Sequence, residues 1–385
     1  MDAVIKKMHL PLILGVLFVF FGCREPFTPE LKELNESILV VEGFIEVGGG
    51  NTSIKLSLAS PLYTDLPNLP VPRAIITLLG ENGERWELGT DNWGAYVTDA
   101  FLPEDEVYTL TIDLSNGQSY VSDKIKPIIS PDFDITFTKE DGNVQVYSNT
   151  TGNDEAEYFL WQYDETWMYR TPYTSFFNYD KDTKEMVAIP LDQLTNRCYN
   201  FDQSRRVILE ASSRFENNRI FQKELLTIDS LSEKLGVRYR IKARQYAIDR
   251  EAYIFWESIR RNSDDIGDIF SPLPSAVSSN IHAIDDPDES VIGYVSAGKS
   301  NEKILYINSN DVLPWRTSLK DYFGCVIDTV APIDYEEIFG LLNFTPLYEY
   351  CENLPCGGYF YSTEGCTDCR LRGGVLQKPD YWEDE

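Results

Sequence analysis

Apolar and polar residues alternate in short runs along the first part of the chain, between residues 37 and 130. The alternation is clearest at residues 54–58 and 108–114. Because successive side chains of a strand point to opposite faces, this pattern predicts strands that each bury one face. Turn signals such as Asn116-Gly117 separate the runs. Short strands with regular turns favour an immunoglobulin-like or transthyretin-like β-sandwich over 37–130.

The remaining residues, 131–385, predict a larger β-rich domain with few helices. Apolar runs at 144–147 and 158–163 are strand candidates. Apolar residues at helical spacing over 250–262, with Asp249 in front of them as an N-cap, predict one amphipathic helix. We therefore expect a mainly β fold with one or two short helices and a disulfide-stapled, cysteine-rich C-terminal segment.

Residues 237–244 form the clearest strand pattern in the chain. Apolar residues there alternate with four cations that would share one face: Arg238, Arg240, Lys242 and Arg244. Such a face could contact an anionic ligand or an acidic partner. In the alternative, neighbouring strands place Asp or Glu opposite the cations and form cross-strand ion pairs. The 62 acidic residues of the chain favour this alternative.

Between residues 164 and 200, aromatic side chains are dispersed among polar ones. Four of them are candidates for contacts with a ligand or partner: Trp167, Tyr169, Tyr173 and Phe176. The pattern fits equally well with irregular core aromatics beneath long loops. Both interpretations stay open at the level of sequence.

The N-terminal residues have the layout of an export signal. Lys6 and Lys7 precede an apolar run at residues 10–21. That run is shorter than the roughly 20 residues that a bilayer-spanning helix needs. Gly22 and Cys23 follow directly, as in a lipobox.

We therefore expect residues 1–22 to be a signal peptide and Cys23 to carry lipid. Buried acyl chains would then anchor the protein to a membrane. The polar, proline-bearing residues 23–36 would form a tether between the lipid and the folded part. The alternative is an ordinary secretory signal in which Cys23 has no special role.

Charge narrows the classes of function. The 385 residues include 34 basic and 62 acidic side chains, which gives a formal net charge of −28. Such a surface repels nucleic acid and anionic headgroups, so we exclude DNA or RNA binding. Aromatic residues make up 13% of the chain, which favours β structure and contact surfaces over a helical bundle.

Six cysteines remain when Cys23 is set aside: Cys198, Cys325, Cys351, Cys356, Cys366 and Cys369. An even number in an exported protein indicates disulfides, and six cysteines allow fifteen pairings, among which the sequence does not choose. A zinc site built on the C-x-x-C at residues 366–369 is the alternative. The oxidising compartment and the irregular spacing favour disulfides, so we expect no metal site.

Histidine is scarce, which limits the possible catalytic chemistry. The chain has only two, and His9 lies in the predicted signal peptide. A nucleophile–histidine arrangement would therefore depend on His282. No nucleophile motif of the G-x-S-x-G kind and no phosphate-binding glycine loop is present. We expect His282 in a loop or at a strand edge, and we assign neither catalytic residues nor a cofactor.

Several segments together resemble a known family. They are the apolar strand at 38–45, the basic strand at 237–244, the helix at 252–259, Val-Ile-Gly-Tyr-Val-Ser-Ala at 291–297, and Cys-Thr-Asp-Cys-Arg-Leu-Arg-Gly-Gly with Lys-Pro-Asp-Tyr-Trp within 366–382. The chain resembles Bacteroidetes lipoproteins catalogued as domain of unknown function forty-two forty-nine. Members are often encoded beside TonB-dependent transporters, so the resemblance implies an accessory role at the cell surface. It implies no catalytic residues.

We therefore expect an outer-membrane lipoprotein, exposed to the cell exterior, that serves a TonB-dependent transporter as a non-catalytic binding or accessory subunit. The alternatives are a free-standing adhesin or structural lipoprotein, and an extracellular hydrolase that uses carboxylates. A concave pocket lined by aromatics would favour the first function. A smooth, loop-covered surface would favour the adhesin, and two carboxylates facing each other in a cleft would favour the hydrolase.

Overall fold

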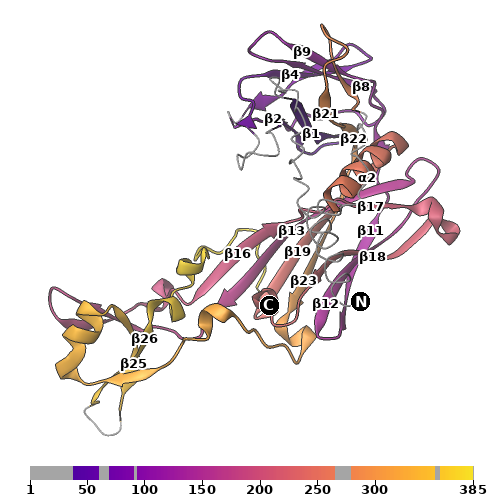
Figure 1. Ribbon diagram of the computed structural model, residues 1–385. Helices are drawn as coiled ribbons and strands as arrows, with labels where there is room; N and C mark the ends of the chain where they lie inside the picture. Colours follow the sequence, from indigo (N-terminus) through magenta and orange to yellow (C-terminus); the bar gives the residue numbers. More distant parts are fainter. Residues whose placement is uncertain (1–37, 60–68, 91–92, 265–278, 352–355, 385) are drawn as a thin grey trace, which may run out of the picture. The chain divides into compact units, whose positions relative to one another are not determined.

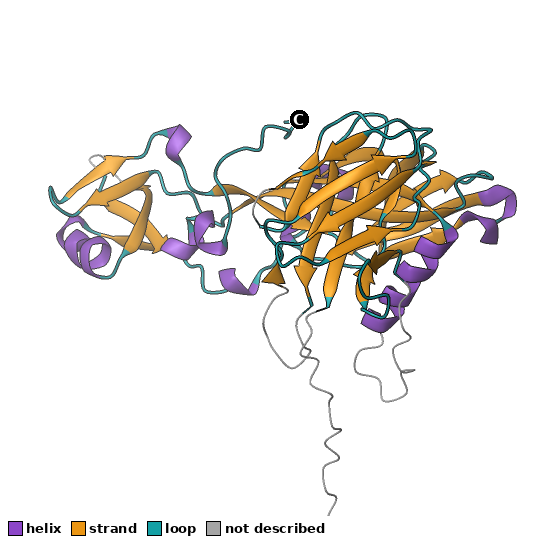
Figure 2. Ribbon diagram, turned by 90° about the horizontal axis from the view of Figure 1, so that it is seen from above, coloured by secondary structure: helices purple, strands orange, loops and turns teal. Residues whose placement is uncertain are grey.

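The structure is a computed structural model that describes residues 38–59, 69–90, 93–264, 279–351 and 356–384 (Figure 1). These residues belong to one compact unit, Ile38–Glu385. The fold is mainly β, as predicted, with strands arranged in several sheets (Figure 2). The predicted signal peptide, Cys23 and the tether lie outside the described residues. Within the described part of the chain, no helix is both long and apolar enough to span a bilayer.

Two sheets form the N-terminal sandwich. The first has the strand order β10-β22-β1-β2-β7-β6, with β3 and β21 paired beside it. Its strands are β1 (Leu39–Glu46), β2 (Thr52–Leu58), β3 (Leu69–Pro70), β6 (Gly89–Thr90), β7 (Ala95–Thr98), β10 (Ile128–Ile129), β21 (Val291–Gly293) and β22 (Ser296–Lys299). The second has the order β20-β9-β8-β4-β5. Its strands are β4 (Ile75–Gly80), β5 (Arg85–Glu87), β8 (Tyr108–Asp113), β9 (Ser119–Ser122) and β20 (Ile281–Ala283).

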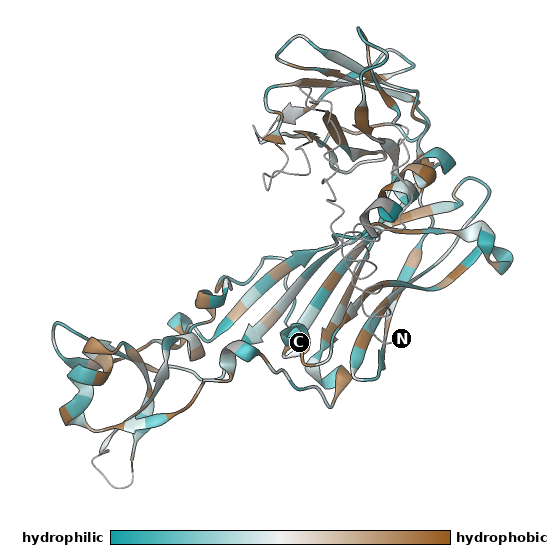
Figure 3. Cartoon of the chain, in the orientation of Figure 1, coloured by the Kyte–Doolittle hydropathy of each residue, from teal (hydrophilic) through white to brown (hydrophobic). Residues whose placement is uncertain are grey.

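The alternation in the sequence places the apolar side chains between these two sheets. Ile54 and Leu56 of β2 and Leu110 and Ile112 of β8 are all fully buried in one shared core. Apolar residues are concentrated on these strands (Figure 3). Burial of apolar area is the main favourable term in folding, so this core holds the sandwich together.

A late segment of the chain completes this sandwich. Strand β22 runs parallel to β1, with Phe44 opposite Ser296, and it also pairs with β10. Strand β20 pairs with β9. The sequence prediction ended the sandwich at residue 130 and did not include these strands. Pairing between segments so far apart in the chain leaves no local pattern that a reading of the sequence could detect.

Two further sheets form a second sandwich. One has the order β16-β13-β19-β23, with β17 also paired to β13, and we call it the central sheet. Its strands are β13 (Tyr158–Arg170), β16 (Arg197–Gln203), β17 (Ile208–Ala211), β19 (Arg238–Ile248) and β23 (Asn301–Asn308). The facing sheet contains β11 (Phe133–Glu140), β12 (Asn143–Thr151) and β18 (Arg219–Ile228). Val146 and Leu226 of the facing sheet share a buried core with Tyr239 and Ile241 of β19.

Helix α2 (Arg250–Asp264) confirms the predicted helix and extends it slightly. Asp249 is its N-cap, because its carboxylate accepts a hydrogen bond of 2.6 Å from the backbone N–H of Ala252. Ala252 and Tyr253 are buried beside β17 and β19. Shorter helical turns are η1 (Leu191–Gln193), η2 (Ser212–Arg214), η3 (Glu216–Asn218), η4 (Glu233–Leu235), η5 (Ser309–Val312), η6 (Lys320–Tyr322), η7 (Pro332–Asp334), the π-helical η8 (Glu336–Leu341), η9 (Glu364–Cys366) and η10 (Cys369–Arg372).

A smaller lobe, which we call the C-terminal lobe, is built from two separate parts of the chain. Its three-stranded sheet contains β24 (Asp328–Val330), β25 (Phe344–Tyr350) and β26 (Gly358–Thr363). The hairpin of β14 (Phe177–Asp180) and β15 (Glu185–Ala188) joins it. Tyr179 of the hairpin shares a small buried core with Val330 and Phe339.

All six cysteines form disulfides, as the sequence predicted. The pairs are Cys198–Cys369, Cys325–Cys366 and Cys351–Cys356. The two cysteines of the C-x-x-C therefore bind different partners, which contradicts the alternative of a zinc site there. Glu349 lies near the sulfur atoms of Cys351 and Cys356, but a disulfide offers no thiolate to a metal.

The two most different disulfides should differ in their effect on stability. Cys198–Cys369 joins residues 171 apart in the chain, and Cys351–Cys356 joins residues 5 apart. In the chain-entropy account, alanine at both cysteines should lower the free energy of unfolding by about 5 kcal/mol for the long loop and about 2 kcal/mol for the short one. Urea unfolding of the two double variants checks this, and equal losses would contradict it.

Candidate ligand-binding site

The cations of β19 lie on the outer face of the central sheet, as the alternation predicted. Tyr239 and Ile241 point into the core and are fully buried. Arg238 and Arg240, on the opposite face, are nevertheless only 8% and 5% exposed. They are covered because aromatic side chains of other segments lie over them, which the sequence did not predict.

Lys242 and Arg244 form ion pairs with an acid on the neighbouring strand, which confirms the second interpretation of the basic strand. Both bind Glu302 of the neighbouring strand β23, with distances of 2.9 Å from Lys242 Nζ to Oε2 and 2.7 Å from Arg244 Nε to Oε1. Arg244 and Glu302 are direct partners in the strand register. Burial alone would raise the pKa of Glu302, but the hydrogen bonds and charges of the two cations outweigh it and lower the pKa below its usual value.

Arg238 and Arg240 stack on aromatic rings. The guanidinium of Arg238 lies 4.4 Å from the ring centroid of Tyr306, and its Nη1 donates to Asn308 Oδ1 at 3.0 Å. The guanidinium of Arg240 lies 4.5 Å from the ring centroid of Tyr381. Among the residues that the structure describes, Arg240 has no ion pair or hydrogen-bond partner for its side chain, and its Nε is buried.

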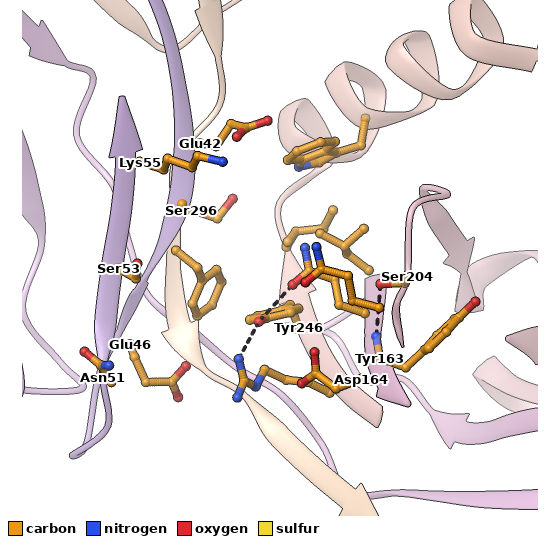
Figure 4. Close-up of a pocket in the computed structure, with 18 of the residues that line it drawn as sticks. Glu42, Glu46, Asn51, Ser53, Lys55, Tyr163, Asp164, Ser204, Tyr246 and Ser296 are labelled. Atoms are coloured by element: carbon orange, nitrogen blue, oxygen red, sulfur yellow. Dashed lines mark hydrogen bonds between the residues drawn. The ribbon is translucent and has the colours of Figure 1, made fainter. Parts of the chain in front are cut away.

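A cavity of about 610 Å³ opens beside this face, and we call it the first cavity. Its walls come from β1 and β2 of the N-terminal sandwich and from β13 and β19 of the central sheet. Figure 4 shows Asn51, Ser53 and Lys55 on one side, with Tyr246 and Asp164 on the other. The remaining lining residues are Glu42, Gly43, Phe44, Glu46, Leu160, Gln162, Tyr163, Gln203, Ser204, Lys242, Arg244, Ile248, Trp256, Tyr294 and Ser296.

Aromatic contacts connect the two walls of the first cavity. The rings of Phe44 and Tyr246 lie 4.7 Å apart between centroids. The hydroxyl of Tyr246 accepts from Arg244 Nη1 at 3.2 Å and donates to Gln162 Oε1 at 3.3 Å. Burial raises the pKa of Tyr246. The phenol therefore stays neutral at physiological pH and serves as both donor and acceptor.

Helix α2 contributes an aromatic side to the first cavity. Trp256 is half-buried and contacts Phe255 edge to face, with 5.2 Å between ring centroids. The hydroxyl of Tyr294 donates to the N-cap carboxylate of Asp249 at 3.2 Å. The N-cap thus fixes both the start of the helix and one of the aromatic lining residues.

A second cavity of about 590 Å³ adjoins the first. Both are lined by Asp164, Gln203 and Lys242, so they share part of their wall. The other residues that line the second cavity are Glu165, Thr166, Phe201, Asp202, Arg240 and Tyr381. Arg240 therefore faces the second cavity although little of its surface is exposed.

The C-terminal residues form one wall of the second cavity. Trp382 is 3% exposed and contacts the rings of Tyr199 and Tyr306 edge to face. The hydroxyl of Tyr381 lies 3.1 Å from Thr166 Oγ1. Val375 exchanges backbone hydrogen bonds with Tyr199. Tyr381 and Trp382 of the C-terminal motif therefore hold the last residues of the described chain against the central sheet.

The residues that line the two cavities include neither histidine nor cysteine. Burial raises the pKa of Glu46, but its two carboxylate oxygens accept hydrogen bonds of 2.8 Å from the backbone N–H and the hydroxyl of Ser300. His282 lies on the edge strand β20, with Nε2 3.2 Å from Asp123 Oδ1, and lines neither cavity. This strand-edge position agrees with the sequence analysis.

Two of the four aromatic contact candidates are buried, and the other two are partly buried or exposed. Trp167 and Tyr169 are 6% and 2% exposed, because they lie on β13 within the core rather than on a surface loop. Tyr173 is partly buried and donates a hydrogen bond of 3.0 Å to the backbone carbonyl of Cys325. Phe176 is exposed, but it lines neither cavity. The aromatic residues of the site come from other segments.

Sequence reasoning missed most of the first cavity. One signal was available, because continuing the alternation of β19 by one step places Tyr246 on the same face as Arg244. Trp256 also had a visible position on the predicted helix. The contributions of β1 and β2 had no such signal, since they depend on the packing of distant segments.

A family model described as "Domain of unknown function (DUF4249)" matches residues 24–304. The chain belongs to this family. The match includes β1, β2, β13, β19 and α2, which supply most of the first cavity. It ends before the C-terminal motif and before the three-stranded sheet of the C-terminal lobe, but it includes the β14–β15 hairpin of that lobe. Within that motif, Gly374 packs so closely against Tyr169 and Cys198 that a Cβ atom would clash with both.

The other comparisons add no information about function to the DUF4249 assignment. No curated protein matches the chain. Among solved structures, a two-domain fibronectin type-III segment of chicken tenascin is 11% identical and covers 55% of this chain and 91% of its own, with a TM-score of 0.18. The chicken interferon gamma receptor alpha chain is 12% identical and covers 55% and 89%, with a TM-score of 0.15. At these TM-scores neither likeness carries an argument.

The shared ion pairs of Glu302 predict a pH-dependent stability difference in this DUF4249 protein. Because the folded pKa of Glu302 is lowered, its contribution is present above the unfolded value of about 4.3 and is lost as pH falls through the folded pKa. Glu302→Gln should lower the free energy of unfolding by a few tenths to about 1 kcal/mol at pH 7, since the pairs are partly exposed and screened by solvent.

This difference between wild type and Glu302→Gln should shrink as the pH falls below the unfolded value of about 4.3, and it should disappear once the carboxylate is protonated in both states. Denaturant titrations at several pH values measure it. Glu81→Gln is the matched control, because the Lys124–Glu81 pair is exposed on both sides and should contribute nothing measurable. A loss that is independent of pH would contradict the prediction.

Proposed function

We propose that this protein is an outer-membrane lipoprotein, anchored by lipid on Cys23 and facing the cell exterior. In this role it binds a polar ligand as a non-catalytic accessory subunit of a TonB-dependent transporter. The observation that carries the proposal is the pair of adjoining cavities on the outer face of the central sheet. Concave sites with aromatic walls and a few convergent polar groups are where small ligands bind.

The lining of the first cavity favours a polar ligand. It includes three acids and three bases: Glu42, Glu46, Asp164, Lys55, Lys242 and Arg244. Aromatic side chains such as Trp256 and Phe44 add apolar surface. A ligand with many hydrogen-bonding groups and a flat apolar side would match both kinds of surface.

The C-terminal lobe supports a protein partner. Four of its large apolar side chains are each more than two-thirds exposed: Phe323 (73%), Val326 (68%), Ile333 (88%) and Leu341 (72%). Where exposed apolar side chains adjoin one another, they mark sites of protein–protein contact. In our proposal the transporter covers this lobe, while the cavities hold the ligand.

The proposal about the transporter can be tested in the native membrane. The tagged full chain would be extracted with a gentle detergent, and the proteins that accompany it would be identified by mass spectrometry. We expect a stoichiometric TonB-dependent transporter. The double variant Phe323→Ser/Ile333→Ser should lose it, because two exposed apolar contacts are removed, whereas Trp256→Ala should retain it.

Recovery of the lipoprotein alone, by an extraction that keeps other transporter complexes intact, would contradict the accessory role. It would favour a free-standing adhesin. Loss of the transporter from Trp256→Ala but not from the lobe variant would place the contact at the cavities instead.

The lipid anchor gives a separate prediction. Cys23→Ala should no longer be recovered as lipidated protein in the membrane fraction. The reason is that buried acyl chains supply the free energy of membrane binding, at about 0.8 kcal/mol per CH₂. The matched control is Cys351→Ala/Cys356→Ala, which also removes cysteines but should remain in the membrane pellet. Fractionation and protease treatment of intact cells measure both location and exposure. Lipid-labelled Cys23→Ala protein would refute the assignment.

A further inference from the structure

We propose that Arg240, assisted by Lys242, forms a binding subsite for an oxyanion in the second cavity. The ligand would carry a carboxylate, sulfate or phosphate group at this position. The inference rests on the proposed function, since it assigns part of the ligand to one of the two cavities.

The first argument is the unusual environment of the Arg240 guanidinium. A buried charge normally has an ion-pair partner, because its removal from water is costly. Arg240 is 5% exposed, yet no carboxylate among the described residues pairs with it. Its buried Nε also lacks an acceptor there. Tyr381 contacts the face of the guanidinium. Such stacking leaves the in-plane N–H donors free for the bidentate binding of an oxyanion.

The acids around the second cavity are largely neutralised already. Both carboxylate oxygens of Glu165 accept hydrogen bonds of 2.8 Å from Lys234, and Oε1 accepts a further one of 2.6 Å from the hydroxyl of Tyr239. Asp202 accepts a hydrogen bond of 3.2 Å from Arg205. Only Asp164, which is exposed at the boundary with the first cavity, lines the second cavity without an ion pair to a described residue.

The cations on the same face are in local excess. Glu302 is one carboxylate shared between two cations, Lys242 and Arg244. One positive charge therefore remains on that trio, Arg240 adds another, and the carboxylate of Asp164 offsets one of the two. A local excess of cations in a chain whose formal net charge is −28 favours an anionic group in the cavity.

Arg238 shows that stacking on an aromatic ring does not by itself leave an arginine on this face without a hydrogen-bond partner. Arg238 lies on the same strand face, is 8% exposed and stacks on Tyr306. It donates to Asn308, however, and it is not among the residues that line the two cavities. Of these two similar arginines, only Arg240 lines one of the two cavities, so Arg238 provides a matched control.

The shared wall of the cavities indicates the class of ligand. An oxyanion at Arg240 would lie beside Lys242 and Gln203, which also line the first cavity. The rest of the ligand would extend toward the aromatic and polar side chains of that cavity. We infer a hydroxyl-rich ligand with an acidic group, of which an acidic saccharide is the simplest representative.

Isothermal titration calorimetry can test the subsite on the full chain, extracted from its membrane in detergent. The probes are glucuronate, sulfate and the neutral counterpart glucose, at constant ionic strength. We expect saturable binding of both anions and weaker binding of glucose. Arg240→Gln should weaken binding of the anions by about tenfold or more, because a charged hydrogen bond is lost, and should leave glucose unchanged.

Arg238→Gln should bind the anions as wild type does. Its melting temperature shows how much stability is lost when a buried arginine is removed from this face, and the melting temperature of Arg240→Gln is compared with it. Arg240→Lys keeps the charge without the planar fork and should retain part of the binding. Anion binding that is absent in wild type, or that is equal in wild type and Arg240→Gln, would overturn the subsite.

Trp256→Ala distinguishes failure of the oxyanion subsite from failure of the proposed function, because it changes the wall of the first cavity and leaves Arg240 in place. If Trp256→Ala weakens binding of the probes while Arg240→Gln does not, the cavities bind a ligand but have no oxyanion subsite. If neither variant affects binding of any probe, both the subsite and the cavity assignment are contradicted.

Discussion

The junction between the two sandwiches is the constraint on which the candidate site depends. The chain leaves the N-terminal sandwich at β22 and enters the central sheet at β23 almost immediately. Ser300, between these strands, donates two hydrogen bonds to Glu46 of β1, and the amide of Asn301 donates to the backbone carbonyl of Ser130 at 2.7 Å. These bonds offset part of the cost of burying Glu46. They also fix the strands that line opposite walls of the first cavity.

The polar character of the site follows from the outer face of the central sheet. One carboxylate, Glu302, satisfies two of the four cations, and aromatic rings cover the other two. Such a face is too charged to form a dry core, so it either remains hydrated or binds a polar molecule. The two carboxylate oxygens of Glu46 accept hydrogen bonds from Ser300, which fixes the orientation of this acid on the wall of the first cavity.

The sequence predicted those elements whose structure depends on residues close together in the chain. The alternation over 237–244 placed the cations on one face, and Asp249 marked the start of the helix. The covering of Arg240 by Tyr381 could not be predicted, because it joins residues far apart in the chain. Trp167 was a surface candidate because polar residues surround it in the sequence, but it packs in the buried core between the two sheets of the second sandwich. The site was therefore only partly visible in the sequence.

The central claim is that the cavities beside the central sheet hold a ligand in the native protein. Native mass spectrometry of the protein extracted from its own membrane tests this most directly. The account predicts a discrete bound mass on wild type that is lost from Trp256→Ala, since this variant removes part of the cavity wall but none of the junction. A bound mass that persists in Trp256→Ala, or wild-type protein without any bound mass, would contradict the claim.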